Sequence, residues 1–332
     1  MQVRLVLRSP GTGHSLENLF NRLLDELMKD ERIEPHKVVL PHISTGLPAV
    51  WKNILFILKQ APAVNHITGD VHYVALATSR RHTLLTIPDC VLLNRTPKRS
   101  VRYMVFWLLW YYLPIRRAAL VTAISEKTRR ELYQYVGRLA DKVIVVPCHY
   151  DPLFTYSPKA FNSDYPTLLH VGTAPHKNLG RLINAIAGLA CRLLIVGKLS
   201  DIDEALLITH KIDYKNYINS SQNEIITLYK QCDIVLFVSL YEGFGLPIIE
   251  GQVIGRPVVT SAISPMNEVG GEGACYVDPT NEADIRRGIL SVLNNQPYRD
   301  ELIRLGLANA ENYSINRITE KYVALYESLR SL

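Results

Sequence analysis

The chain has 332 residues, of which 48% are hydrophobic and 20% are charged, with a formal net charge of +6. This profile is typical of a water-soluble globular protein, and the length suggests two domains. The five cysteines are scattered and form no Cys-x-x-Cys pair, which argues against a disulfide framework or a zinc site and fits a reducing cytoplasm.

The N-terminal residues predict the opening of a Rossmann-like unit. Residues 1–8 are typical of a strand, being too short and too charged for a signal peptide. Gly11 and Gly13 follow in a loop at residues 9–17, and an amphipathic helix comes next, with one apolar face formed by Leu19, Phe20, Leu23, Leu24 and Leu27. The dinucleotide-binding fingerprint has three glycines, so two argue against an NAD site. The loop is either a ligand loop or an ordinary tight turn.

The rest of the first half continues the alternation of strands and helices. We expect strands at residues 38–40, 84–87, 119–125 and 142–147, and a helix at 49–60. The stretch at 64–73 is unusually polar and crowds His66, Thr68, Asp70 and His72 at a strand end. Each histidine either takes part in chemistry there or only satisfies local backbone groups.

Residues 91–120 concentrate positive charge, with six Lys and Arg residues and no acid. They enclose the longest apolar run, residues 104–115, which has 12 residues, whereas a spanning helix needs about 20. Two Trp and two Tyr bracketed by cations suit a membrane interface, so we expect Lys98 to Arg117 to dock on an anionic membrane. A buried helix is the alternative. No motif for binding nucleic acid is present.

The second half repeats the plan after a linker at residues 151–165. A strand at 167–171 leads through Gly172 and Thr173 to a helix at 179–190, with Lys177 near the helix start. A further strand is expected at 192–196, and Asp201-Ile-Asp203 is interpreted as a helix start rather than a metal motif. More helices are expected at 224–231, at about 281–294 and 298–311, and at 315–330.

The most informative stretch is residues 233–251. An apolar strand at 233–238 is followed by two glycines, Gly243 and Gly245, and by Pro247, which suits the first position of a helix. A strand, a glycine turn and a helix N-terminus form a place for an anion. Glu242 and Glu250 flank it. They fit a ligand that carries hydroxyl groups as well as phosphate, such as a sugar nucleotide.

The segment Glu242-Gly-Phe-Gly-Leu-Pro-Ile-Ile-Glu250, followed by Gly255-Arg-Pro-Val-Val-Thr-Ser261, resembles the donor-site signature of the family-4 retaining glycosyltransferases, the group 1 glycosyl transferase family. The resemblance covers most of the chain and is strongest from about Thr122 onwards. It implies an α/β fold of the GT-B type, in which two Rossmann-like doubly wound domains face each other across a cleft. The implied domains are 1–150 for the acceptor, 151–165 as linker, 166–312 for the donor, and 313–332 as a helix returning to the first domain.

The resemblance also implies roles for single residues. Glu250 would bind the ribose, Glu242 would hold hydroxyls of the donor sugar, and Lys177 would stabilise the departing diphosphate together with backbone N–H groups. The other residues implied at the donor are Gly172, Thr173, Gly243, Phe244, Gly245 and Leu246, and the loop with Gly11 and Gly13 would lie beside phosphate and acceptor. No metal and no cofactor is implied beyond a UDP- or GDP-sugar as co-substrate.

Two departures from the family pattern stand out. The family often has a histidine near the reacting carbon where this chain has Pro88, so we expect His66 to serve in catalysis instead. The family also usually has an arginine where this chain has Thr173, a role that His176 or Arg181 would take.

The function expected is retaining transfer of a hexose from a nucleotide sugar to a glycan or a lipid-linked acceptor, in cell-surface polysaccharide synthesis. The enzyme would be cytoplasmic, with peripheral attachment to the inner face of the membrane. The alternatives are a non-catalytic subunit, and a sugar-nucleotide epimerase or phosphorylase with the same architecture.

Overall fold

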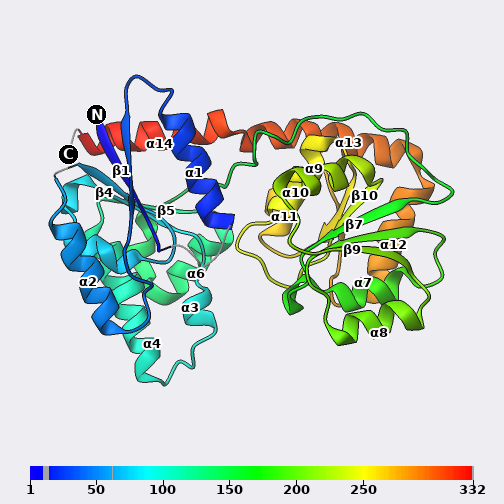
Figure 1. Cartoon of the computed structure of the whole chain (residues 1–332), viewed down its shortest axis with the longest axis horizontal. Coiled ribbons are helices and arrows are strands. Elements are labelled where there is room, and N and C mark those ends of the chain that lie inside the picture. The colour runs from blue at the N-terminus through cyan, green and yellow to red at the C-terminus, as the bar shows by residue number, and fades with distance from the viewer. Residues whose placement is uncertain (10–14, 62, 331–332) are drawn as a thin grey trace. The chain divides into compact units, whose positions relative to one another are not determined.

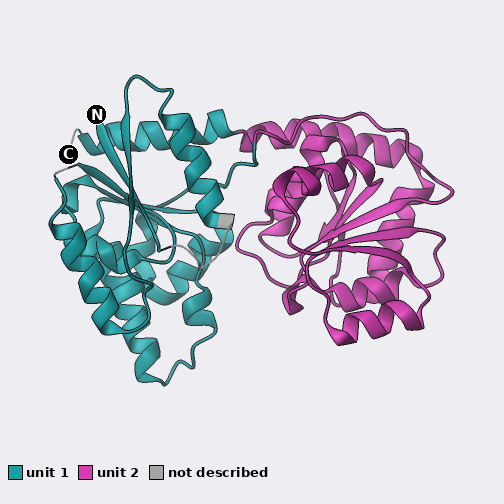
Figure 2. Cartoon of the chain, in the orientation of Figure 1, with its two compact units in different colours: residues 1–151, 315–332 teal, residues 152–314 magenta. Residues whose placement is uncertain are grey.

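The computed structural model describes residues 1–9, 15–61 and 63–330, and it divides into two compact units (Figure 2). The first unit comprises Met1–Asp151 with Ile315–Leu332, and the second comprises Pro152–Ser314. The chain therefore leaves the first unit once and returns to it with its last helix. Gly11 and Gly13 lie outside the described residues.

The first unit contains a six-stranded parallel sheet in the order β2-β1-β3-β4-β5-β6. β3 and β4 are buried along their whole length. β4 is mostly apolar, as is usual for a buried parallel strand, whereas β3 carries the buried polar residues Asn65 and His66. The strands are β1 (Gln2–Leu7), β2 (Glu34–Val39), β3 (Val64–Ile67), β4 (Thr83–Ile87), β5 (Leu120–Ala123) and β6 (Val143–Val145).

Helices cover both faces of this sheet (Figure 1). α1 (Ser15–Leu27) and α14 (Ile315–Arg330) pack against each other, and they lie on the opposite side of the sheet from α2 (Leu47–Leu58) and α4 (Val101–Phe106). The remaining helical segments are α3 (Val91–Asn94), α5 (Leu113–Arg117) and α6 (Glu126–Val136), with the 3-10 turns η1 (His72–Ala77), η2 (Arg80–His82) and η4 (Gly137–Lys142).

The apolar run at residues 104–115 forms one bent helical segment, because a π-helix (Trp107–Tyr112) joins α4 to α5. Pro114 has no N–H to give to the carbonyl of Trp110, four residues earlier. The ring of His72 supplies that partner, with Nδ1 2.8 Å from the Trp110 oxygen. Trp110 and Tyr111 are buried. The prediction that the aromatic residues of this run face a membrane is therefore wrong for these two.

The second unit contains another six-stranded parallel sheet, in the order β12-β11-β10-β7-β8-β9. β9 was not expected from the sequence, because Asp-Tyr-Lys-Asn-Tyr lacks an apolar run and forms a partly exposed edge. The strands are β7 (Thr167–Val171), β8 (Arg192–Val196), β9 (Asp213–Tyr217), β10 (Ile234–Phe237), β11 (Val258–Ser261) and β12 (Cys275–Val277).

The helices of the second unit form two layers. α7 (Leu179–Ile186) contacts α8 (Asp201–Thr209) and α12 (Glu282–Asn294). In the second layer, α10 (Leu246–Ile254) contacts three helices: α9 (Gln222–Gln231), α11 (Met266–Gly270) and α13 (Gln296–Ala310). The unit also contains the 3-10 turns η5 (Pro175–Lys177) and η6 (Glu311–Tyr313). Ser200 and Asp203 form a capping box at the start of α8, so the interpretation of Asp201-Ile-Asp203 as a helix start is confirmed.

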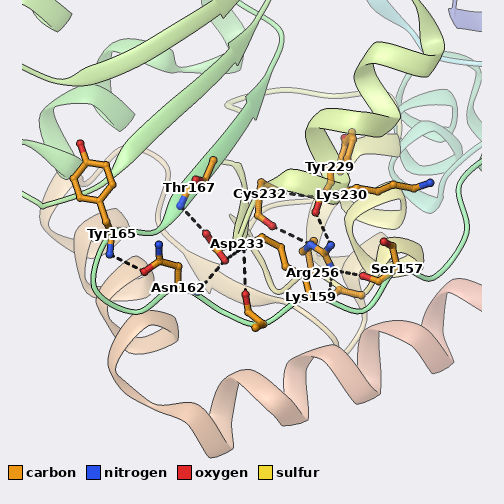
Figure 3. A network of polar contacts seen from close by, with 12 residues as sticks. Ser157, Lys159, Asn162, Tyr165, Thr167, Tyr229, Lys230, Cys232, Asp233 and Arg256 are labelled. Atoms are coloured by element: carbon orange, nitrogen blue, oxygen red, sulfur yellow. Dashed lines mark hydrogen bonds and ion pairs between the residues drawn. The ribbon is translucent and has the colours of Figure 1, made fainter.

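Part of the segment expected to be a linker is fastened to the second unit by a polar network (Figure 3). The buried carboxylate of Asp233 pairs with Lys159 and accepts hydrogen bonds from the backbone N–H groups of Asn162 and Thr167, at 3.1 and 2.8 Å. Beside it, the buried Arg256 donates to backbone carbonyl oxygens, including that of Ser157 at 2.8 Å. Residues 157–167 therefore have fixed partners in this unit.

Three further properties bear on function. Among the described residues, no helix combines the length and the apolar composition that crossing a membrane requires. All five cysteines are buried and free. Within residues 1–9, 15–61 and 63–330, no three His, Cys, Asp or Glu side chains converge as ligands for a metal ion would.

Candidate functional site

The second sheet has its topological switch point between β7 and β10. From β7 the chain proceeds outward through β8 to β9, and from β10 it proceeds in the other direction through β11 to β12. Because the two strands are parallel neighbours, the loops that follow them leave from the same edge. Ligands of such sheets bind at this edge, where the strand order reverses. The two predicted donor loops, which carry Lys177 and Glu242, are these two loops.

Lys177 and Glu242 are brought together as an ion pair across the switch point. Nζ of Lys177 lies 2.7 Å from Oε1 of Glu242, and it also lies 4.7 Å from the ring centre of Phe237. Both side chains are mostly shielded, being 18% and 13% exposed. The close approach depends on Gly172, whose φ is +95° and where a Cβ atom would come within 2.9 Å of the Lys177 side chain.

Asn178 holds the surrounding loops in place. It is buried in the left-handed conformation, with φ 66°, and its amide donates to the carbonyl oxygens of Val238 at 2.9 Å and Pro279 at 2.7 Å. Arg181 donates to the side-chain oxygen of Asn178 at 2.9 Å. The predicted loops after β7 and β10 are thus joined to the loop before α12. In this structure the guanidinium of Arg181 supports Asn178, a contact that sequence reasoning did not anticipate.

Thr173 and Phe244 are engaged with the protein itself. The hydroxyl of Thr173 donates to the carbonyl oxygen of Lys198 at 2.6 Å, which ties this loop to the one after β8. Phe244 is buried, and its ring packs edge-on against Tyr313 with 5.7 Å between centres. Both side chains therefore have partners within the protein, and the Phe244 ring anchors its loop. That the backbone of these two residues contacts the donor stays a prediction.

The start of α10 has the geometry expected of an anion site. Gly245 precedes the helix with φ 121°, a conformation that other residues rarely adopt, and Pro247 lies in the first turn. No side chain caps this helix start. Pro247 has no N–H, and the N–H of Ile248 donates to the carbonyl oxygen of Gly245 at 3.0 Å, so the donors that this helix start can offer are those of Gly245 and Leu246. Gly243, Gly245 and Leu246 therefore lie where the sequence placed them, at a helix N-terminus that follows a buried strand.

Glu250 lies in the second turn of α10, because the helix begins at Leu246. Its Oε2 accepts a hydrogen bond of 2.6 Å from the hydroxyl of Tyr229 on α9. Tyr229 is fully buried and packs edge-on against Phe154. Burial and the neighbouring carboxylate raise the pKa of Tyr229 well above its usual value. The hydroxyl therefore stays protonated and fixes one oxygen of Glu250.

The expectation that His66 takes part in catalysis does not fit its position. The ring lies in the core of the first unit, with Nδ1 2.7 Å from the Tyr326 hydroxyl and Nε2 2.7 Å from the Thr86 hydroxyl. Burial lowers the pKa of His66 to about 3. Both ring nitrogens are occupied, so the side chain joins α14 to the sheet. His72 is buried too, and of its two interpretations the structural one fits, since it satisfies the Trp110 carbonyl.

Sequence reasoning missed two polar groups beneath the site. His170 in β7 is fully buried, its Nδ1 lies 3.1 Å from the carbonyl oxygen of Leu236, and burial lowers its pKa to about 4. Ser239 follows β10, and its carbonyl accepts from the Ser261 hydroxyl at 2.6 Å. In the described part of the chain, His170 Nε2 and Ser239 Oγ have no hydrogen-bond partner. A histidine inside an apolar strand was the available signal.

Comparisons with known proteins agree with this geometry. Residues 156–307, which include both donor loops, match the model of the family described as glycosyl transferases group 1. O-antigen chain mannosyltransferase B from Escherichia coli is 28% identical over 260 residues, which cover 70% of this chain and 66% of that protein. The aligned part thus spans slightly less than two thirds of the relative's own length.

Two solved structures have the same fold over nearly the whole chain. Sucrose-phosphate synthase from Thermosynechococcus elongatus has a TM-score of 0.79 at 16% identity, with 99% of each chain covered. HepE from Anabaena in complex with UDP-glucose has a TM-score of 0.78 at 18% identity, with 100% of each chain covered. The signature at β10 and α10 and the match over residues 156–307 show that the second unit is similar to the group 1 glycosyl transferases, and the two parallel sheets and these two structures show the GT-B fold.

Proposed function

We propose that the protein transfers a hexose from a nucleotide sugar to a glycan or a lipid-linked acceptor, with retention of the anomeric configuration, in the synthesis of cell-surface polysaccharide. The observation that carries the proposal is the Lys177–Glu242 pair at the switch point of the second sheet, next to the uncapped start of α10. A cation, a carboxylate and free N–H groups suit a ligand with both phosphate and hydroxyl groups.

The roles of the donor residues follow from their chemistry. Lys177 would contact the diphosphate, and the first turn of α10 near Gly245 and Leu246 would add N–H donors to the same charge. Glu242 would accept hydrogen bonds from hydroxyls of the donor sugar. Glu250, with one oxygen fixed by Tyr229, would bind the ribose. The donor would be a UDP- or GDP-sugar; the UDP-glucose in HepE and the mannosyltransferase relatives support a hexose.

The catalytic effect would be mainly electrostatic. Charge builds up on the diphosphate as the glycosidic bond breaks, and donors aimed at that charge stabilise the transition state. Before the donor binds, the Glu242 carboxylate neutralises the Lys177 ammonium group at a distance of 2.7 Å. A sugar that draws the Glu242 carboxylate to its hydroxyls would leave the lysine charge to the phosphate. The ion pair would in this way hold the lysine in place before the donor binds.

The acceptor side of the proposal rests on the first unit. Exposed cations at Lys98, Arg99 and Arg102 support peripheral attachment to an anionic membrane, where a lipid-linked acceptor would be found. Arg117 contributes less, because its guanidinium donates to the carbonyl oxygens of Ala75 and Thr78 at 3.1 and 3.0 Å.

An NMR assay of the purified protein with UDP-glucose and GDP-mannose, with and without a membrane fraction as source of acceptor, tests the proposal. We expect a new glycosidic linkage with the anomeric configuration of the donor. Inverted product would contradict retention. Isomerised donor sugar would identify an epimerase, and bound donor with neither transfer nor hydrolysis would identify a non-catalytic subunit.

A further inference from the structure

α2 presents its apolar side chains to the outside and its polar amide to the inside. Leu47, Trp51, Leu55 and Leu58 follow one another at helical spacing, and they are 61%, 61%, 41% and 59% exposed. Asn53 is fully buried. Helices of water-soluble proteins show the opposite arrangement, and a helix that is apolar on all sides is normally covered by something. We call these four residues the α2 stripe.

The orientation of α2 is fixed by the buried amide. The Asn53 side chain donates to the His42 carbonyl oxygen and contacts the Tyr73 hydroxyl, both at 2.8 Å, and it accepts from the His42 N–H at 3.1 Å. Val50 and Ile57 pack into the core on the same inward face. A rotation that buried the α2 stripe would break these hydrogen bonds and expose Val50 and Ile57. The exposure of the stripe therefore follows from the packing of the helix.

The part of the sequence that contains the α2 stripe is positively charged. Residues 35–125 contain eleven Lys and Arg but only two acidic residues, Asp70 and Asp89. Lys52 and Lys59 are exposed on or next to α2 itself. α4 lies on the same side of the first sheet (Figure 1) and exposes Val101 and Met104. Apolar side chains among many cations and few acids are the pattern of helices that lie in the headgroup region of an anionic bilayer.

We propose that the α2 stripe inserts into the surface of an anionic membrane, with α2 lying in the plane of the interface. Its 12 residues are about 18 Å long at 1.5 Å per residue, too short to cross. Trp51 suits the headgroup level, where aromatic rings with a polar edge concentrate. This inference rests on the proposed function in one respect: a lipid-linked acceptor would be found in the same membrane. It also moves the apolar anchor from the 104–115 run to α2.

A bilayer fits the stripe better than a second copy of the chain does. In a twofold dimer the same patch meets itself, so the Lys52 and Lys59 side chains would face like charges. An anionic surface instead gains from each of these cations. α8 in the second unit provides the contrast: Ile202 and Ile208 are 74% and 70% exposed, but its first turn carries Asp201, Asp203 and Glu204. α8 should therefore stay away from an anionic membrane.

Sedimentation with vesicles tests the proposal. The wild type should sediment with vesicles of phosphatidylcholine and phosphatidylglycerol at low salt, and much less with phosphatidylcholine alone or at high salt. Trp51→Glu combined with Leu55→Glu should lower the partition coefficient about tenfold or more, whereas Ile202→Glu combined with Ile208→Glu should leave it unchanged. A wild type that stays in the supernatant, or a stripe variant that sediments like the wild type, would overturn the proposal.

Tryptophan fluorescence locates the contact. Of the three tryptophans, Trp51 is the exposed one, while Trp110 is buried and Trp107 packs against the core. Anionic vesicles should shift the wild-type emission to the blue and should not shift that of Trp51→Phe, which keeps the apolar area and still sediments. A wild-type dimer that the stripe variant converts to monomer, without vesicle binding, would instead assign the stripe to self-association and contradict the proposal.

The donor site serves as the internal control. The stripe variant should keep the same thermal shift with nucleotide sugars as the wild type, since α2 lies in the first unit and Lys177 in the second. If no nucleotide sugar shifts the wild type while vesicle binding behaves as described, the proposed function fails and the membrane surface stands.

Discussion

At the scale of single residues, the site depends on contacts that hold charged groups in place. Lys177 reaches Glu242 because Gly172 leaves room for its side chain, and Glu250 is held by a tyrosine from a neighbouring helix. Each of the two contacts joins a residue of the donor signature to a residue outside it. The signature supplies Glu242 and Glu250, Lys177 comes from the loop after β7, and Gly172 and Tyr229, also outside the signature, set their positions.

Tyr229→Phe should therefore weaken donor binding. The change removes one hydrogen bond to the Glu250 carboxylate, which is worth about 1–1.5 kcal/mol, so we expect KM for the donor to rise about fivefold to tenfold with a smaller effect on kcat. Tyr165→Phe is the matched control, because Tyr165 also donates to a carboxylate, Asp213 at 2.9 Å, but on the surface. Equal effects of the two substitutions would argue against a positioning role for Tyr229.

Gly172→Ala should disturb the lysine itself. A Cβ atom at this position would meet the Lys177 side chain at 2.9 Å, and φ +95° adds strain. Gly188→Ala has the strain without the contact, since φ is +74° and nothing lies within 4 Å. Both variants should lose about 1–2 kcal/mol of stability. Only Gly172→Ala should weaken donor binding, as measured by isothermal titration calorimetry; an equal loss in Gly188→Ala would exclude the steric explanation.

At the scale of elements, most helices and strands could be predicted because local rules agree with the tertiary structure. Ser125, a residue type that favours the N-cap, caps α6, and its hydroxyl accepts from the N–H of Thr128. β7, β8 and α14 begin and end where the apolar pattern places them. These segments combine a clear period with a cap or a turn at each end.

The elements that were missed are those in which tertiary contacts decide. β9 has the composition of a loop and becomes a strand because β8 offers its edge. The π-helix arises where Pro114 interrupts the helical hydrogen bonds and His72 replaces one of them. The site shows the same division: the loops with Lys177 and Glu242 could be found from the sequence, but the buried Tyr229 and Asn178 could not, because their partners are distant in sequence.

The segment at 157–167 gives a prediction at this scale. Arg256 is buried and donates to the carbonyl oxygens of Ser157, Cys232 and Lys230, so Arg256→Met would leave several buried acceptors without a donor (Figure 3). We expect a loss of about 3 kcal/mol or more in the unfolding free energy of the second unit. Arg304→Met, on an exposed pair with Glu301, should cost far less. Urea denaturation measures both.

At the scale of the whole molecule, each unit buries histidines that are kept neutral. Burial lowers the pKa of His66 to about 3 and the pKa of His72 and of His170 to about 4. In the unfolded chain these rings take up protons below about pH 6.5. Because the folded state binds fewer protons there, stability is fully present above that pH and is lost as the pH falls toward 4.

Both units should therefore lose stability on mild acidification. His66→Gln should flatten the pH dependence of the first unit only, whatever its effect on stability at neutral pH. His82→Gln, at an exposed position, should leave the slope unchanged. If the unfolding free energy of the first unit depends on pH as steeply in His66→Gln as in the wild type, buried His66 is not a source of this pH dependence.

The central claim is that the switch point of the second sheet binds a nucleotide sugar through Lys177 and Glu250. Thermal unfolding in the presence of UDP-, GDP-, ADP- and dTDP-sugars tests it most directly, since a ligand at a hundred times its Kd stabilises the fold by about 2.7 kcal/mol. We predict that at least one of them raises the Tm of the wild type and of Lys230→Ala, an exposed control. Lys177→Ala and Glu250→Ala should each weaken that ligand by about 1.5–3 kcal/mol. Folded variants with the wild-type shift, or no shift with any sugar nucleotide, would contradict the account.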